Sequence, residues 1–71
     1  MTVQEHLVEN VANYVQNKGW NYFPDYITAE DVTDEMRTIP CAELVNDETL
    51  AWLITLARYY EYNKAMFDFE D

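Results

Sequence analysis

The chain is poor in the residues that interrupt regular structure. Its 71 residues include one glycine, Gly19, two prolines, Pro24 and Pro40, and no serine. Few turns are therefore expected, and a serine nucleophile is excluded. The single cysteine, Cys41, cannot form an internal disulfide, so the fold must be stabilised by packing. Because secreted domains of this size usually carry disulfides, we expect a cytoplasmic protein.

Positive charge is equally scarce. Four Lys and Arg residues stand against fourteen Asp and Glu residues, which gives a net charge of −10. Nucleic-acid binding depends on basic side chains that neutralise phosphates, so direct binding of nucleic acid is excluded, including by a helix-turn-helix domain. Two interpretations of the acidity remain open. It either keeps the protein soluble or recognises a protein partner with a basic surface.

Long hydrophobic runs are absent too. The longest stretch, 50–57, is interrupted by Thr55 and is far too short to span a bilayer. The first residues, 1–6, contain neither the basic nor the apolar part of a signal peptide, so we expect no signal peptide and no membrane partner.

Hydrophobic residues are nevertheless abundant, at 49% of the chain with 15% aromatics, which predicts a folded protein rather than a disordered one. The length allows one domain, residues 1–71. Apolar residues three and four positions apart predict an all-α fold, a small bundle of three to four helices with an aromatic loop between the first two.

The first helix is expected over 2–18, with a Thr2–Glu5 capping box at its start and Gly19 at its end. The predicted second helix runs from Thr28, as N-cap, to Ile39. The aromatic loop is expected over 20–27 and a short helical turn over 40–45. The last predicted helix runs from 46 or 47 to about 66. The remaining residues, 67–71, are expected to fray.

No arrangement of residues indicates catalysis. The one histidine, His6, and the one cysteine, Cys41, have no catalytic signature around them. His6 is more simply explained as a surface residue, and Cys41 as a small buried residue. No Cys or His pair has zinc spacing, the acidic stretch lacks the glycine of a calcium loop, and one glycine cannot build a phosphate-binding loop. We therefore predict a protein that is not an enzyme and has no metal or other cofactor.

The candidate binding residues are acidic. On a helical wheel of the predicted second helix, four carboxylates share one side: Glu30, Asp31, Asp34 and Glu35. Successive i,i+4 steps advance about 6 Å, close to the phosphate spacing of a nucleic-acid strand. If these carboxylates bind a partner, neutralising all four is expected to abolish that binding. The same change is expected to stabilise the fold, because like charges at i,i+4 spacing destabilise a helix. The first helix carries a similar pair, Glu5 and Glu9. The alternative is an ordinary solvated helix face.

The last helix is apolar around most of its circumference, more than the rest of so small a protein can cover. Part of its surface is therefore expected to meet another molecule, with Trp52 and Tyr59 as the candidate contacts.

Two functions follow from these features. In size, charge and helicity the chain is similar to small acidic proteins that bacteriophages make against restriction enzymes, CRISPR effectors and uracil-DNA glycosylase. This resemblance implies an inhibitor that mimics the charge of nucleic acid and blocks the basic groove of a nucleic-acid enzyme. The alternative is a non-catalytic interaction module or helical homodimer, in which the acidity serves solubility.

Overall fold

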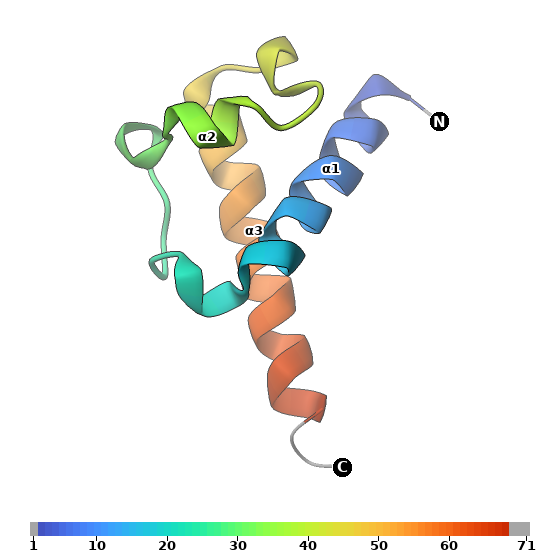
Figure 1. Ribbon diagram of the computed structural model, residues 1–71, viewed down its shortest axis with the longest axis vertical. Coiled ribbons are helices and arrows are strands. Elements are labelled where there is room, and N and C mark those ends of the chain that lie inside the picture. Colours follow the sequence, from blue (N-terminus) through green and yellow to red (C-terminus); the bar gives the residue numbers. More distant parts are fainter. Residues whose placement is uncertain (1, 69–71) are drawn as a thin grey trace.

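The computed structural model describes residues 2–68, which form two long helices and a connection that packs on one side of them (Figure 1). The long helices are α1 (Val3–Lys18) and α3 (Asp47–Asp68). The connection, residues 19–46, holds a four-residue helix and three 3₁₀ turns: η1 (Trp20–Tyr22), η2 (Ala29–Asp31), α2 (Asp34–Arg37) and η3 (Ala42–Leu44). No strand occurs between residues 2 and 68, so the all-α prediction is confirmed.

Both long helices begin and end close to the predicted positions. At the start of α1, the Glu5 amide donates to the Thr2 hydroxyl at 3.2 Å, and Glu5 accepts from the Thr2 amide at 3.4 Å. The helix stops at Gly19, whose φ of 92° suits glycine and whose amide donates to the Val15 carbonyl at 2.8 Å. Helix α3 continues to Asp68, beyond the predicted end at Met66. The last part of the expected frayed tail, 69–71, lies outside the described residues.

The predicted continuous second helix is wrong. Val32, with φ −70° and ψ 121°, is extended and separates η2 from α2. Each piece has its own threonine cap: Thr28 is bonded to Asp31, and the Thr33 hydroxyl accepts from the Met36 amide at 3.3 Å. Two adjacent β-branched residues and a threonine that bonds the backbone locally favour a new start over a continued helix.

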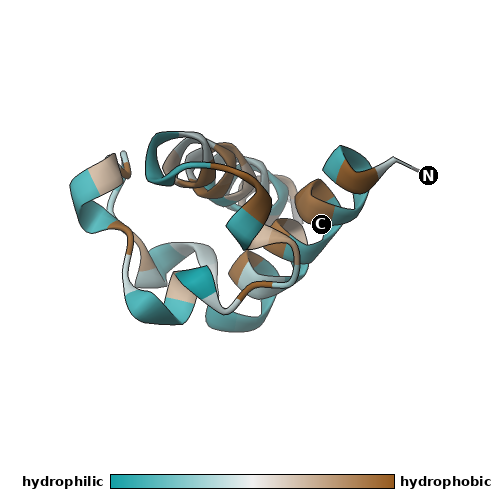
Figure 2. Cartoon of the chain, turned by 90° about the horizontal axis from the view of Figure 1, so that it is seen from above, coloured by the Kyte–Doolittle hydropathy of each residue, from teal (hydrophilic) through white to brown (hydrophobic). Residues whose placement is uncertain are grey.

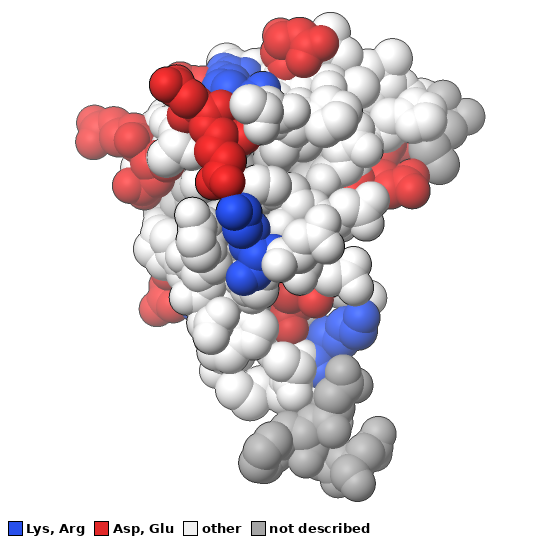
Figure 3. All heavy atoms as spheres, in the orientation of Figure 1, with Lys and Arg blue, Asp and Glu red and all other residues white. Residues whose placement is uncertain are grey.

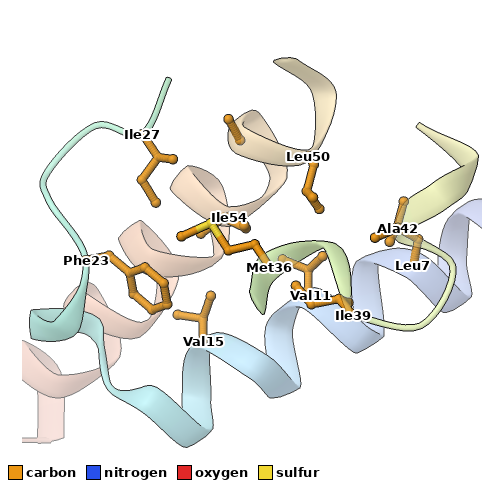
Figure 4. Close-up of a cluster of buried hydrophobic side chains, with 11 residues drawn as sticks. Leu7, Val11, Val15, Phe23, Ile27, Met36, Ile39, Ala42, Leu50 and Ile54 are labelled. Atoms are coloured by element: carbon orange, nitrogen blue, oxygen red, sulfur yellow. The ribbon is translucent and has the colours of Figure 1, made fainter. Parts of the chain in front are cut away.

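All three parts of the chain contribute to the core, the connection most of all (Figure 4). Eleven buried hydrophobic residues form one cluster: Leu7, Val11 and Val15 from α1, Leu50, Ala51 and Ile54 from α3, and Phe23, Ile27, Met36, Ile39 and Ala42 from the connection. Figure 2 shows hydrophilic residues on the outer turns of the connection and hydrophobic ones between them. The connection is therefore a structural layer that completes the core.

A buried threonine joins the connection to α3. The Ile27 amide donates to the Thr55 hydroxyl at 3.0 Å, and that hydroxyl lies 2.9 Å from the Ala51 carbonyl, to which it can donate. Residue Thr55 is 9% exposed and residue Ile27 2%, so the Ile27 amide and the Thr55 hydroxyl that bonds it have little access to water. Burial makes the hydrogen bond expensive to lose.

Two arginines complete the attachment of the connection. Arg58 donates to the Trp20 carbonyl at 3.2 Å and to Asp25 at 2.9 Å, and its guanidinium lies 5.5 Å from the centre of the Trp20 ring. Arg37 donates to the carbonyls of Ala42 and Val45 at 2.7 and 2.9 Å and is bonded to Asp47. Both side chains use the several donors of a guanidinium to organise irregular backbone.

The Thr55 contact predicts a clear order of stabilities. Thr55→Val removes the acceptor of a buried amide and is expected to lower the free energy of unfolding by about 1–3 kcal/mol. Thr55→Ser keeps the hydroxyl and loses one methyl group, which costs about 1 kcal/mol. Urea unfolding followed by circular dichroism measures both. A valine variant as stable as the serine variant would contradict this role.

A second prediction concerns Cys41, whose φ of 73° is left-handed although it is not glycine. At such a position glycine avoids the steric cost that a Cβ atom brings, about 1–2 kcal/mol. We therefore expect Cys41→Gly to be more stable than Cys41→Ala by about 1 kcal/mol, the reverse of the order inside a helix. Thermal unfolding of the two variants checks this, and a more stable alanine variant would refute it.

Candidate protein-binding surface

Half of the acidic residues lie in one stretch of the chain. Residues 30–48 hold seven of the fourteen acids and a single basic residue, Arg37. We call these seven residues the acidic end: Glu30, Asp31, Asp34, Glu35, Glu43, Asp47 and Glu48. In Figure 3 acidic atoms gather at the top and upper left of the molecule, over η2 and α2. The charge is therefore concentrated at one end of the fold.

Three of the four basic side chains are used inside the molecule. Lys18 pairs with Glu35 at 2.9 Å, Arg58 pairs with Asp25 at 2.9 Å, and Arg37 pairs with Asp47. Among residues 2–67, these are the only carboxylates that have a basic partner. The other carboxylates in that range have no counter-charge, and all of them except the half-buried Glu61 are exposed, so the surface attracts cations.

Glu35 is part of a small polar network that joins α2 to α1. The Tyr14 hydroxyl donates to Glu35 at 3.0 Å, and the ammonium group of Lys18 lies on the other carboxylate oxygen. The hydrogen bonds from Lys18 and Tyr14 lower the pKa of Glu35. Burial of the phenol, followed by its bond to Glu35, raises the pKa of Tyr14 to about 12. Glu35 therefore helps to hold α2 against α1.

The four carboxylates predicted as one row play two different roles. Asp31 accepts from the amide and the hydroxyl of Thr28 at 3.0 and 3.1 Å, so it caps η2. Glu30 and Asp34 are exposed and make no hydrogen bond or ion pair within the described residues. Because the segment breaks at Val32, the regular 6 Å spacing of the predicted helix does not exist. The expectation that neutralising all four stabilises the protein is also revised, because Asp31 and Glu35 support the fold.

The remaining predicted residues lie on the two long helices. Glu5 closes the capping box of α1, and Glu9 is exposed one turn later, beside the same shallow hollow as Val8. Trp52 and Tyr59 are 51% and 62% exposed on the outer side of α3. The structure leaves both aromatic rings accessible.

One hollow brings two of the predicted residues together. It has a volume of about 470 Å³ and lies between residues 26–30 and the beginning of α3. Its lining consists of Tyr26, Ile27, Thr28, Ala29, Glu30, Glu48, Ala51 and Trp52. Glu30 and Trp52, which are 22 positions apart in the sequence, therefore share one site with two residues that the sequence did not single out, Tyr26 and Glu48.

The two missed residues differ in how easily they could be found. Glu48 precedes Trp52 by four positions in a predicted helix, and residues at that spacing share a helix face. Tyr26 carries no such signal, because its position depends on the attachment of Ile27 to Thr55 across the fold.

The chemistry of this hollow suits a cation. Two carboxylates, from Glu30 and Glu48, can bind a guanidinium or ammonium group by charge-assisted hydrogen bonds. The exposed rings of Tyr26 and Trp52 can receive the same group against their faces. The lining contains no basic residue that would compete for the two carboxylates.

A comparison with known proteins gives no match to a protein-family model, to a curated protein or to a solved structure. No helix within residues 2–68 has the length and hydrophobicity needed to cross a membrane.

The Glu35 network predicts a pH dependence. Its lowered pKa means that Glu35 contributes stability above about pH 4.5, the ordinary value of the carboxyl, and that this contribution is lost as the pH falls through the folded-state pKa. Glu35→Gln is therefore expected to lower the melting temperature at pH 7. Between pH 5 and pH 3, the melting temperature of this variant should fall less than that of the wild type.

The matched control is Asp34→Asn, which removes the same charge from the neighbouring exposed position. Thermal unfolding followed by circular dichroism at several pH values compares the two. If both variants lost the same stability at pH 7, the network around Glu35 would have no special role.

Proposed function

We propose that the protein is a non-catalytic inhibitor that binds the basic groove of a nucleic-acid enzyme and excludes the nucleic acid. The observation that carries this proposal is the acidic end, where two exposed carboxylates without counter-ions, Glu30 and Glu48, line a hollow together with two aromatic rings. A groove that binds phosphates presents the opposite charge, and complementary potentials accelerate association.

The proposed mode of mimicry differs from the one that the sequence suggested. A continuous helix with carboxylates in a row would imitate one strand of regular phosphates. The acidic end instead combines carboxylates from η2, α2, η3 and the first turn of α3. The proposal therefore rests on the density of negative charge at one end and on the ability of Glu30 and Glu48 to hold an arginine or lysine of the target.

The proposal predicts how the target is captured and released. Immobilised protein should retain a nucleic-acid enzyme from bacterial lysate, and both rising salt and added DNA or RNA should release it, because the interface is electrostatic. Mass spectrometry of the salt fractions identifies the target. Capture of a protein that does not bind nucleic acid and resists high salt would contradict the proposal.

A pair of double variants locates the interface. Glu30→Gln with Glu48→Gln removes the two carboxylates of the hollow, neither of which supports the fold, and is expected to weaken target binding about tenfold or more. Glu9→Gln with Glu61→Gln changes the net charge equally on the helices α1 and α3. Calorimetry with the captured target compares the two, and equal weakening would show that only total charge matters.

Self-association is a second candidate function, which the exposed outer side of α3 favours. Its large exposed side chains include Trp52, Leu56, Tyr59 and Tyr60. A two-fold dimer would bury them. Wild-type protein should then sediment as a dimer, and Trp52→Glu as a folded monomer, because Trp52 lies outside the core. A wild type that remains monomeric at high concentration would rule the dimer out.

A further inference from the structure

Helices α1 and α3 diverge on the side of the molecule that the connection does not cover (Figure 1). In that view the connection runs along the left of the molecule and across its top, and the angle between α1 and the lower half of α3 opens to the right. A groove of about 320 Å³ runs along this angle. Its lining is Val8, Val11 and Ala12 from α1, and Leu53, Leu56, Ala57, Tyr60 and Glu61 from α3.

The groove has an apolar floor that is open to solvent. Val8 is 51% exposed, Leu56 46% and Tyr60 66%, although side chains of this kind favour burial. Val8 and Ala12 also line a neighbouring hollow on α1, and Tyr60 lines another farther along α3. The three depressions therefore form one apolar strip, which is the kind of surface that marks a binding site.

The charges beside this strip are mostly negative. Glu5 and Glu9 line the hollow on α1, and Glu61 lines the groove itself. The one basic residue on the strip, Lys64, lies in the hollow at the far end. An occupant therefore meets an apolar floor, carboxylates at one end and along the middle, and a single ammonium group at the other end.

We propose that this groove binds an amphipathic, basic α-helix of a partner protein. Apolar side chains at i, i+3, i+4 and i+7 of that helix pack on Val8, Leu56 and Tyr60, as in other helix-in-groove complexes. Lysines and arginines on its flanks meet Glu9 and Glu61, and its most basic end lies towards Glu5. This site is separate from the acidic end and does not require the inhibitor function proposed above.

Charge argues for such a helix over a second copy of this chain. Each copy carries a net charge of −10, and three of its four basic residues are already paired within the molecule. A second copy would bring further carboxylates against Glu9 and Glu61. Like charges that face each other across an interface oppose association.

Calorimetric titration of the intact protein with three synthetic peptides tests the proposal. The first is a leucine–lysine helix of about four turns with one apolar face. The second has the same composition in scrambled order, and the third replaces lysine with glutamate. We expect the amphipathic basic peptide to bind at least tenfold more tightly than the scrambled one, and the glutamate peptide not to bind. Equal affinity for both lysine peptides would overturn the proposal, because charge alone would explain it.

Two sets of variants locate the bound peptide. Val8→Gln with Leu56→Gln replaces exposed floor residues by good helix formers, so the fold should remain and peptide affinity should fall at least tenfold. Trp52→Gln and the double variant Glu30→Gln with Glu48→Gln alter other surfaces and should bind the peptide like the wild type.

The opposite pattern, loss of peptide binding in the acidic-end variant alone, would overturn the groove proposal while leaving the inhibitor proposal standing. Self-association that Val8→Gln with Leu56→Gln abolishes would also overturn it, because a second copy would then occupy the groove. Loss of target binding in the acidic-end variant, with peptide binding intact, would support both proposals separately.

Discussion

The attachment of Ile27 to the Thr55 hydroxyl determines how the rest of the molecule is arranged. The connection has little regular structure of its own, since its helix and turns are three or four residues long. Such short elements are not stable alone, and packing must hold them in place. By bonding the Ile27 backbone in the middle of α3, Thr55 places the next residues, including Glu30, opposite Glu48 and Trp52. Ile27 itself lines the hollow at the acidic end, so this contact helps to fix one wall of the hollow.

The few basic residues connect fold and surface. Each of the three ion pairs joins parts of the chain that are distant in sequence or irregular in structure: Lys18 with Glu35, Arg37 with Asp47, and Arg58 with Asp25. Exposed ion pairs contribute little to stability individually, but Arg37 and Arg58 also satisfy backbone carbonyls. Because the fold uses three of its four cations internally, Glu30, Asp34, Glu43 and Glu48 of the acidic end have no basic partner, which is the property that the proposed function needs.

The molecule presents two surfaces of different chemistry. The acidic end offers carboxylates and two aromatic rings, whereas the groove between α1 and α3 offers an apolar floor with carboxylates beside it. An interface of the first kind is steered by charge and weakened by salt, and one of the second kind gains most of its free energy from buried apolar area. A protein of 71 residues with both surfaces has room for two contacts with one partner or for two partners.

Local signals in the sequence were sufficient for α1 and α3. The Thr2–Glu5 box, Gly19 and the repeat of apolar residues are properties of neighbouring residues, so they can be recognised without a tertiary structure. The same reasoning failed between Thr28 and Ile39, where an apolar stripe suggested one helix. Thr33 begins a second capped turn there, and burial of Met36 and Ile39 in the core is compatible with the broken segment.

The sequence by itself determined the all-α class and the large negative charge, because these depend on composition and short-range pattern. Only the tertiary structure decided which charges are free. Asp31 stands three residues after the Thr28 cap, which is a local signal, but Glu35 could not be distinguished from Glu30 and Asp34 in the sequence. The structure bonds Glu35 within the fold and leaves Glu30 and Asp34 exposed to solvent. The meeting of Glu30 with Trp52, and of Val8 with Leu56, likewise depends on how distant segments pack, which no local pattern encodes.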